Sequence, residues 1–225
     1  MSQVRIITVD GPSGSGKGTI SQRVAEHLGW HFLDSGAIYR VLGVMVDRED
    51  ISIDSVDKIA ELARNMPLSF SGEQAMLAGE DVTGEIRTET AGNRASKVAV
   101  IPEVRSALLE WQQAYAKFPG LVADGRDMGT VVFPQAQVKI FLTASPEERA
   151  KRRYKQLKEK GLGVNLARLI EEIRERDERD SKRTVAPLQA ADGALTLDST
   201  QLSIDEVYNR VMRKVHETFA DLSDN

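Results

Sequence analysis

The sequence predicts an α/β fold, in which a five-stranded parallel sheet is flanked by helices and a smaller subdomain is inserted. Three observations predict this fold class. Short apolar, β-branched runs alternate along the chain with segments of helical periodicity, as in parallel α/β proteins. Five such runs occur, and each ends in polar residues. The alternation is interrupted between about residues 52 and 98.

The five apolar runs are the expected strands. Buried parallel strands read as continuous apolar segments, and "VRIITVD" at residues 4–10 is the clearest case. The connections between such strands are right-handed crossovers. The other four strands are expected at residues 30–35, 120–125, 138–144 and 194–199.

Helices are expected between these strands. Ile20, Val24 and Leu28 recur every four residues, which predicts a helix that ends near Gly29. Pro102 opens another helix at its first turn, where its missing N–H costs nothing. The segments "SPEE" and "SIDE" match the capping-box pattern and predict two helix starts. The expected helices therefore include 36–46, 102–117, 165–183 and those that follow 145–148 and 203–206.

The segment that breaks the alternation is interpreted as an insertion. A short helix is expected at 55–64, followed by small antiparallel strands at 68–83, where Gly-containing turns separate alternating residues. The expected division is a core of residues 1–50 and 100–225, with an insertion at 51–99.

The composition excludes several classes of protein. The 225 residues are 41% hydrophobic and 28% charged, as in ordinary soluble globular proteins, and no apolar run approaches the ~20 residues that span a bilayer. The net charge of −4 argues against a protein that coats nucleic acid. The sequence has no cysteine, which excludes disulfides, and no export signal is visible, so we expect a cytoplasmic protein.

The segment "GPSGSGKGT" (11–19) nearly matches a phosphate-binding loop. Gly11, Gly16 and Lys17 match the pattern G-x-x-x-x-G-K, but Gly18 stands where Ser or Thr is expected, and Thr19 follows one residue late. A strand, a Gly-rich turn and a helix N-terminus direct backbone N–H groups at one anion, and Lys17 adds a full charge. A flexible glycine turn is the alternative. The expected ATP-binding residues are Gly11, Pro12, Ser13, Gly14, Ser15, Gly16, Lys17, Gly18 and Thr19.

Charged residues are expected near this loop. Asp10 and Asp124 end apolar strands, where a carboxylate either orders Mg²⁺ or ties down loop backbone, and the second role is favoured for Asp10. In the expected helix 165–183, an apolar stripe continues into Arg176, Asp180 and Arg183. Such a stripe indicates a cleft with polar contents, or else a solvated helix end with intrahelical ion pairs.

Four segments resemble one known family. The Gly-Lys-Gly-Thr order of the loop is the usual form in nucleoside monophosphate kinases. Together with "LDSGAIYR" (33–40), "DGRDMGTVVFP" (124–134) and "RERDERDSKRTVAPL" (174–188), it makes the chain resemble the bacterial cytidylate kinase family from about residue 4 to 211. The resemblance implies a P-loop kinase that transfers the ATP γ-phosphate to CMP or dCMP, giving CDP or dCDP, with Mg²⁺. It also implies that the insertion binds the nucleoside monophosphate and that residues 146–170 form a short helical lid.

The resemblance further implies the roles of individual residues. Arg40, Arg126 and Arg183 would clamp the acceptor phosphate, because the guanidinium fork suits a dianion. Asp127 would accept from the cytosine amino group, which disfavours uracil, and Ser96 with Arg105 would read the rest of the base. The implied CMP site consists of Ser35, Arg40, Ser96, Arg105, Arg126, Asp127, Arg176, Asp180 and Arg183.

The same resemblance implies a second set of residues, which take part in catalysis and in binding the metal. Arg176 with Asp180 would read the ribose hydroxyls. Thr19 would reach Mg²⁺ through water or serve mainly the α-phosphate, and Asp124 would order Mg²⁺ or its waters. The implied catalytic residues are Lys17, Arg126, Arg183 and Arg153, the last of which lies in the basic run at 149–160 of the lid.

Several alternatives remain open at this point. Arg105 could snorkel to solvent from its helix. The acceptor could be UMP, AMP or a sugar-like acid, since such kinases share the loop and differ at Ser96, Arg105 and Asp127. A switch-like nucleotide-binding module with slow hydrolysis is the alternative from another class, although the sequence has no guanine-reading Asn-Lys-x-Asp motif. The three histidines match no metal spacing and are expected to be structural or surface residues. The expected partners are small nucleotides, not nucleic acid or a membrane, and a monomer is the default.

Overall fold

The structure is a computed structural model that describes residues 3–71, 74–159, 161 and 163–222. The chain divides into two compact units, Met1–Leu33 with Tyr115–Asn225, and Asp34–Ala114. The predicted insertion at 51–99 lies inside the second unit. Within the described ranges, no helix has the length and apolar character that crossing a membrane requires.

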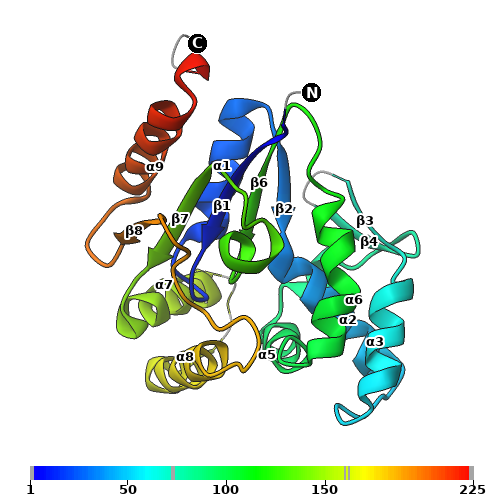
Figure 1. Cartoon of the computed structure of the whole chain (residues 1–225). Helices are drawn as coiled ribbons and strands as arrows, with labels where there is room; N and C mark the ends of the chain where they lie inside the picture. Colours follow the sequence, from blue (N-terminus) through cyan, green and yellow to red (C-terminus); the bar gives the residue numbers. More distant parts are fainter. Residues whose placement is uncertain (1–2, 72–73, 160, 162, 223–225) are drawn as a thin grey trace. The chain divides into compact units, whose positions relative to one another are not determined.

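A five-stranded sheet forms the centre of the first unit (Figure 1). The strands lie in the order β2-β6-β1-β7-β8; β1 pairs in parallel with β6 and β7, and β7 with β8. Each strand begins and ends within one residue of its predicted bounds, which confirms the predicted sheet. The strands are β1 Arg5–Asp10, β2 His31–Asp34, β6 Gly120–Gly125, β7 Val138–Thr143 and β8 Leu195–Asp198.

Helices α1 (Lys17–Leu28) and α9 (Ile204–Thr218) pack against this sheet (Figure 1). Val24 of α1 and Val211 of α9 belong to one apolar cluster with Ile7 and Ile140 of the sheet, all at most 1% exposed. Burying one such side chain contributes about 1.5–3 kcal/mol. The cluster therefore holds firmly the strands whose carboxyl ends carry the candidate functional residues.

A smaller apolar cluster joins α7 (Pro146–Glu159) to α8 (Leu166–Ser181). Ala150 and Leu157 of α7 pack with Leu169 of α8. The apolar stripe predicted for the helix at 165–183 is thereby confirmed. Of the predicted lid at 146–170, residues 160 and 162 lie outside the described residues.

The second unit combines a small antiparallel sheet with helices. Strand β4 pairs antiparallel with β3 and with β5, which confirms the small strands predicted at 68–83; residues 72–73 of that stretch lie outside the described residues. The strands are β3 Leu68–Ser71, β4 Gln74–Leu77 and β5 Glu80–Asp81. The helices are α2 Ser35–Arg48, α3 Val56–Asn65, α4 Thr83–Ile86, α5 Glu89–Val98 and α6 Pro102–Gln113. Helices α4 and α5 are not among the elements predicted from the sequence.

Helix α6 is shorter than predicted. The helix expected at 102–117 ends at Gln113. Ala114 is the C-cap residue, and its N–H donates to the carbonyl of Glu110 at 3.0 Å. Pro119 restricts only Phe118 directly, so the end of the helix at Gln113 is not a consequence of the proline alone.

The two predicted capping boxes differ. Ser203 forms the complete box with Glu206 at the start of α9. The Ser145 hydroxyl forms one half of a box by accepting from the N–H of Glu148 at 3.2 Å. The Ser145 N–H donates instead to Thr200 Oγ1 at 3.0 Å, because β8 ends beside this turn.

Candidate functional site

The loop at residues 11–16 connects β1 to α1 at the carboxyl edge of the sheet. Helix α1 begins at Lys17, and its N-cap residue Gly16, with φ of 94°, has no side chain that could accept from the first N–H groups. The first turn, Lys17–Ile20, contains no acidic residue. Its N–H groups and the positive end of the helix dipole therefore favour an anion.

Lys17 and Asp124 lie together beside this loop. Lys17 Nζ is 3.5 Å from Asp124 Oδ1, and the two side chains are 12% and 6% exposed. The sheet register explains their proximity, since Asp124 of β6 pairs with Val9, one residue before the end of β1. The register thus places one positive and one negative charge at the start of α1.

The position of Asp124 disfavours a side chain at position 18, where Gly18 replaces the usual hydroxyl residue. A Cβ atom at position 18 would lie 3.1 Å from Asp124 Oδ2, which is closer than ordinary van der Waals contact. A serine or threonine at this position would require the Asp124 carboxylate to shift by a few tenths of an ångström. Thr19, which follows one residue late, is exposed.

The residues at this position fit Mg²⁺ through a small number of protein ligands. Mg²⁺ prefers oxygen, keeps several waters and is usually bound by one or two carboxylates plus substrate phosphates. Asp124 supplies one carboxylate, and the glycine beside it leaves the space that a side chain would fill. Among the residues that the structure describes, no group of three or more His, Asp or Glu could hold a metal by itself. The donor set therefore suits an ion held mainly by phosphate and water.

Asp10 ties down the backbone that follows β6. Its two oxygens accept from the N–H groups of Met128 and Gly129, each at 2.8 Å. These residues open the short helix η1 (Met128–Val132), directly after Asp127, which is 3% exposed. Burial raises the pKa of Asp10 to about 7, although the two N–H bonds act in the opposite direction. The backbone-tying role favoured for Asp10 is confirmed, but the backbone is that of η1, not of the phosphate-binding loop.

A second charged cluster surrounds Asp180 near the end of α8. The Asp180 side chain is 1% exposed; one oxygen accepts from Arg126 Nε at 2.9 Å, and the other pairs with the Arg183 guanidinium. Burial alone would raise the pKa of this carboxyl, but the charges of Arg126, Arg183 and Arg176 outweigh it and hold the pKa below its ordinary value. Because Arg183 is only 4% exposed, the alternative of a solvated helix end is excluded for this pair.

The arginines of the basic run lie along α7. Arg153, the predicted lid residue, donates to Gln156 Oε1 on its own helix at 3.4 Å. Arg149 and Arg152 instead donate to carbonyls of the phosphate-binding loop, at 3.1 and 3.3 Å. Neither was singled out from the sequence. The available signal was their three-residue spacing, which places both on one face of a helix.

Four of the predicted site residues belong to the second unit. Ser35 opens α2 and is 4% exposed, and Ser96 of α5 is 2% exposed. Arg40 donates to the last carbonyl of α4 at 2.9 Å. Arg105 is 9% exposed and donates to the carbonyl of Ala99 at 3.3 Å, which excludes the alternative that it snorkels to solvent. Both arginines are thus held by carbonyls of their own unit.

Two histidines have structural contacts in the first unit. His31 Nε2 shares a hydrogen bond with the carbonyl of Phe118 at 2.9 Å. The ring of His27 packs edge-on against Tyr208, with the ring centres 6.2 Å apart. Both histidines are exposed, and the prediction that they are structural or surface residues is confirmed.

Comparison with known proteins identifies the relatives of this chain. The family model described as "Cytidylate kinase" matches residues 7–217. A protein named "Cytidylate kinase" from Aeromonas salmonicida is 55% identical over 222 residues, which cover 97% of this chain and 96% of the relative. A protein of the same name from Colwellia psychrerythraea is 58% identical, over 92% of this chain and 94% of its own length. A third, from Nitrosococcus oceani, is 56% identical, over 93% and 95%.

Proposed function

The chain belongs to the cytidylate kinase family, and on this premise we propose that Lys17, Arg126 and Arg183 drive transfer of the ATP γ-phosphate to CMP or dCMP, giving ADP and CDP or dCDP. The observation that carries this assignment is the cluster at Asp180. One buried carboxylate holds two arginines on the same unit as the phosphate-binding loop. Two ordered guanidinium groups suit a phosphate dianion, because each donates in a planar fork.

The transfer needs no general base. The attacking oxygen belongs to a phosphate that is already ionised near neutral pH, so catalysis consists of positioning and charge neutralisation. Lys17 neutralises the β- and γ-phosphates at the start of α1, while Arg126 and Arg183 hold the acceptor phosphate. Arg153 of α7 approaches the transferred group when the lid closes and excludes water.

ATP is the co-substrate and is proposed to bind along residues 11–19 together with Mg²⁺. Asp124 would hold this ion through its water shell, with Thr19 as a second contact to that shell. When bound, Mg²⁺ would supply positive charge that offsets the charge developing on the phosphate oxygens during transfer. Asp124 also keeps the Lys17 ammonium beside the loop, since the two groups are 3.5 Å apart.

The acceptor nucleotide is proposed to be recognised by phosphate, ribose and base separately. Arg40 joins the phosphate clamp, and Arg176 with Asp180 reads the ribose hydroxyls. Asp127, as a carboxylate, only accepts hydrogen bonds, so it suits the cytosine amino group and repels uracil O4. Ser35, Ser96 and Arg105 complete the set of contacts.

Release of ADP by the purified protein tests this function. The protein is supplied with ATP, Mg²⁺ and one of CMP, dCMP, UMP, AMP or no acceptor. We expect rapid release with CMP or dCMP and almost none without an acceptor. Faster release with UMP or AMP would indicate a kinase for another acceptor. Release that does not depend on any acceptor would indicate the switch-like module with slow hydrolysis.

The enzyme is further inferred to act in the cytoplasm as a monomer. The cysteine-free sequence and the nucleotide substrates support a reducing compartment. Cell fractionation tests the location, and size-exclusion chromatography with light scattering tests the mass. Recovery in a membrane or secreted fraction, or a mass of two chains, would contradict the respective inference.

A further inference from the structure

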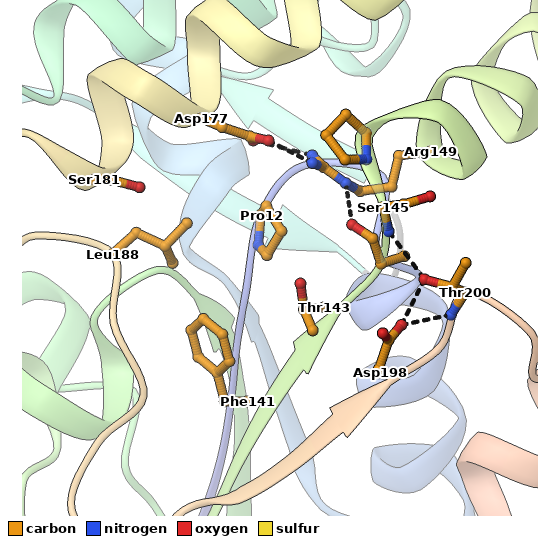
Figure 2. A pocket seen from close by; sticks show the side chains of 12 residues that line it. Pro12, Phe141, Thr143, Ser145, Arg149, Asp177, Ser181, Leu188, Asp198 and Thr200 are labelled. Atoms are coloured by element: carbon orange, nitrogen blue, oxygen red, sulfur yellow. Dashed lines mark hydrogen bonds and ion pairs between the residues drawn. The ribbon is translucent and has the colours of Figure 1, made fainter.

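Arg149 of α7 carries a charge yet is only 2% exposed. Its nitrogen atoms donate to three separate segments of the first unit. Nε donates to the carbonyl of Ala144 at 2.9 Å, and Nη1 to the carbonyl of Ser13 at 3.1 Å. Nη1 also donates to Asp177 Oδ1 at 3.0 Å, and Nη2 to Asp177 Oδ2; Figure 2 shows the two side chains pointing toward each other. A guanidinium engaged in this way is held in one orientation.

Asp177 lies in the last turns of α8, beside residues of the proposed acceptor site. It follows Arg176 directly and precedes Asp180 by three residues, which places Asp177 and Asp180 next to each other on the helix. Two residues of α8, Asp177 and Asp180, therefore link this helix to other elements of the first unit. Asp177 pairs with Arg149, which donates to the phosphate-binding loop. Asp180 pairs with Arg126, which directly follows β6.

The loop itself is closely fitted to Arg149. Gly14 has a φ of +78°, and a Cβ atom there would lie 3.2 Å from Arg149 Cβ. A side chain at position 14 would therefore crowd Arg149, and the hydrogen bond from Arg149 Nη1 to the Ser13 carbonyl couples the two segments directly.

Side chains do not fill all of the space between α8 and the sheet. A pocket of about 460 Å³ lies at this place, and Arg149 and Asp177 line it together with Pro12, Phe141 and Leu188 (Figure 2). Beside this pocket, the ion pair is therefore the direct link between α8 and the segment that contacts the phosphate-binding loop.

We propose that Arg149 and Asp177 form a positioning pair, which fixes α8 to the phosphate-binding loop and so sets the distance between the bound γ-phosphate and the arginines of the acceptor site. This role does not require either residue to contact a substrate. The inference rests on the proposed function of Lys17, Arg126 and Arg183. A misplacement of about 1 Å can lower a rate about 100-fold, so loss of the pair should reduce kcat more than substrate binding.

The main test variant is Asp177→Asn, which preserves the size of the side chain and removes its charge. Arg149→Lys preserves the charge and removes the fork that reaches three segments. The matched control is Glu147→Gln. It breaks the ion pair between Glu147 and Arg174, which joins the same two helices at 2.6 Å but lies at the surface, with side chains 46% and 56% exposed. Each protein is assayed for kcat, for KM of ATP and CMP, for the Kd of each nucleotide alone by calorimetry, and for its midpoint of thermal unfolding.

Asp177→Asn and Arg149→Lys are expected to lower kcat about 10- to 100-fold, while each Kd changes by less than about threefold. Glu147→Gln is expected to keep the wild-type kcat. The proposal is overturned by an unchanged kcat in Asp177→Asn, by an equal loss in Glu147→Gln, or by an effect confined to KM. If Arg149→Lys does not fold, Asp177→Asn decides alone.

Turnover of CMP by the wild-type protein is measured first. A wild type that does not phosphorylate CMP would refute the proposed function. An active wild type together with an equally active Asp177→Asn would refute only the positioning pair.

Discussion

Asp180→Ala should destabilise the first unit strongly, because two buried arginines lose the carboxylate that both contact. The Asp180 side chain is 1% exposed, and those of Arg126 and Arg183 are 14% and 4% exposed. Removing one partner of a buried ion pair costs about 3–5 kcal/mol, since the remaining charges lose the carboxylate that offsets them.

This loss can be expressed as a change in melting temperature. For a chain of this length about 1 kcal/mol corresponds to roughly 2–4 °C, so the midpoint of thermal unfolding should fall by roughly 6–20 °C. Asp180→Asn should lose less, because its carbonyl oxygen still accepts a hydrogen bond. The control is Glu178→Gln on the same helix, which removes an exposed ion pair with Lys182 and should leave the midpoint unchanged.

The pH dependence provides a second measurement of the same pair. Burial opposes ionisation of Asp180, but the charges of Arg126, Arg183 and Arg176 prevail and lower its pKa from the ordinary 3.8. A group whose pKa is lowered by folding contributes stability above its unfolded pKa and loses that contribution as the pH falls through its folded pKa. The difference between wild type and Asp180→Ala should therefore be complete at neutral pH and shrink below about pH 4.

Thermal unfolding followed by circular dichroism at pH 7 and at lower pH measures both effects. If Asp180→Ala at pH 7 loses no more than Glu178→Gln, the buried cluster contributes nothing to stability and the reasoning is refuted. A loss of equal size at every pH would instead refute the claim that the carboxylate is ionised in the folded protein.

Four further predictions concern the loop, the arginines, the base and the sheet. Lys17→Ala should lower kcat about 10²- to 10³-fold, measured as ADP release, while the protein stays folded. Arg126→Ala and Arg183→Ala should each lower kcat/KM for CMP, and the double variant should lose less than the product of the two because both residues share Asp180. Asp127→Ala should forfeit a charge-assisted hydrogen bond and lower kcat/KM for CMP about 30- to 150-fold, with little change for UMP. Burial raises the pKa of Asp10 from 3.8 to about 7, so wild type should lose stability relative to Asp10→Asn as the pH rises from about 4 to about 7, measured as thermal midpoints.

Each of these four has an outcome that contradicts it. Retention of more than about a tenth of the activity would remove Lys17 from the mechanism. Strictly additive losses would show that Arg126 and Arg183 act separately. Equal losses with CMP and UMP would give Asp127 a general role in transfer and none in reading the base. Parallel pH profiles for wild type and Asp10→Asn would mean that Asp10 keeps its ordinary pKa in the folded protein.

The strands and most helices could be predicted because local sequence determines them. Strand β6 occupies the predicted residues, since a continuous apolar run marks a strand buried on both faces. Helix α5 was missed for a related reason. Its buried face consists largely of small residues such as Ala91, Gly92 and Ala95, which give little apolar periodicity, because α5 packs closely against α2 at Gly43.

Only part of the candidate site could be predicted from the sequence. The loop at 11–19 and the charged end of α8 are visible in the sequence, because both depend on residues close together along the chain. The family likewise follows from short contiguous motifs. The contacts of Arg149 and the close approach of Asp124 to position 18 could not be predicted in the same way.

Only the tertiary structure decides which charged groups of distant segments come into contact. Asp124 faces Gly18 because the register between β1 and β6 brings it there, and no pattern within either segment specifies that register. Asp180 reaches Arg126, and Asp177 reaches Arg149, through the packing of α8 on α7 and beside the sheet. Periodicity assigns a residue to one face of its own helix or strand, but the face that it meets depends on how distant segments pack.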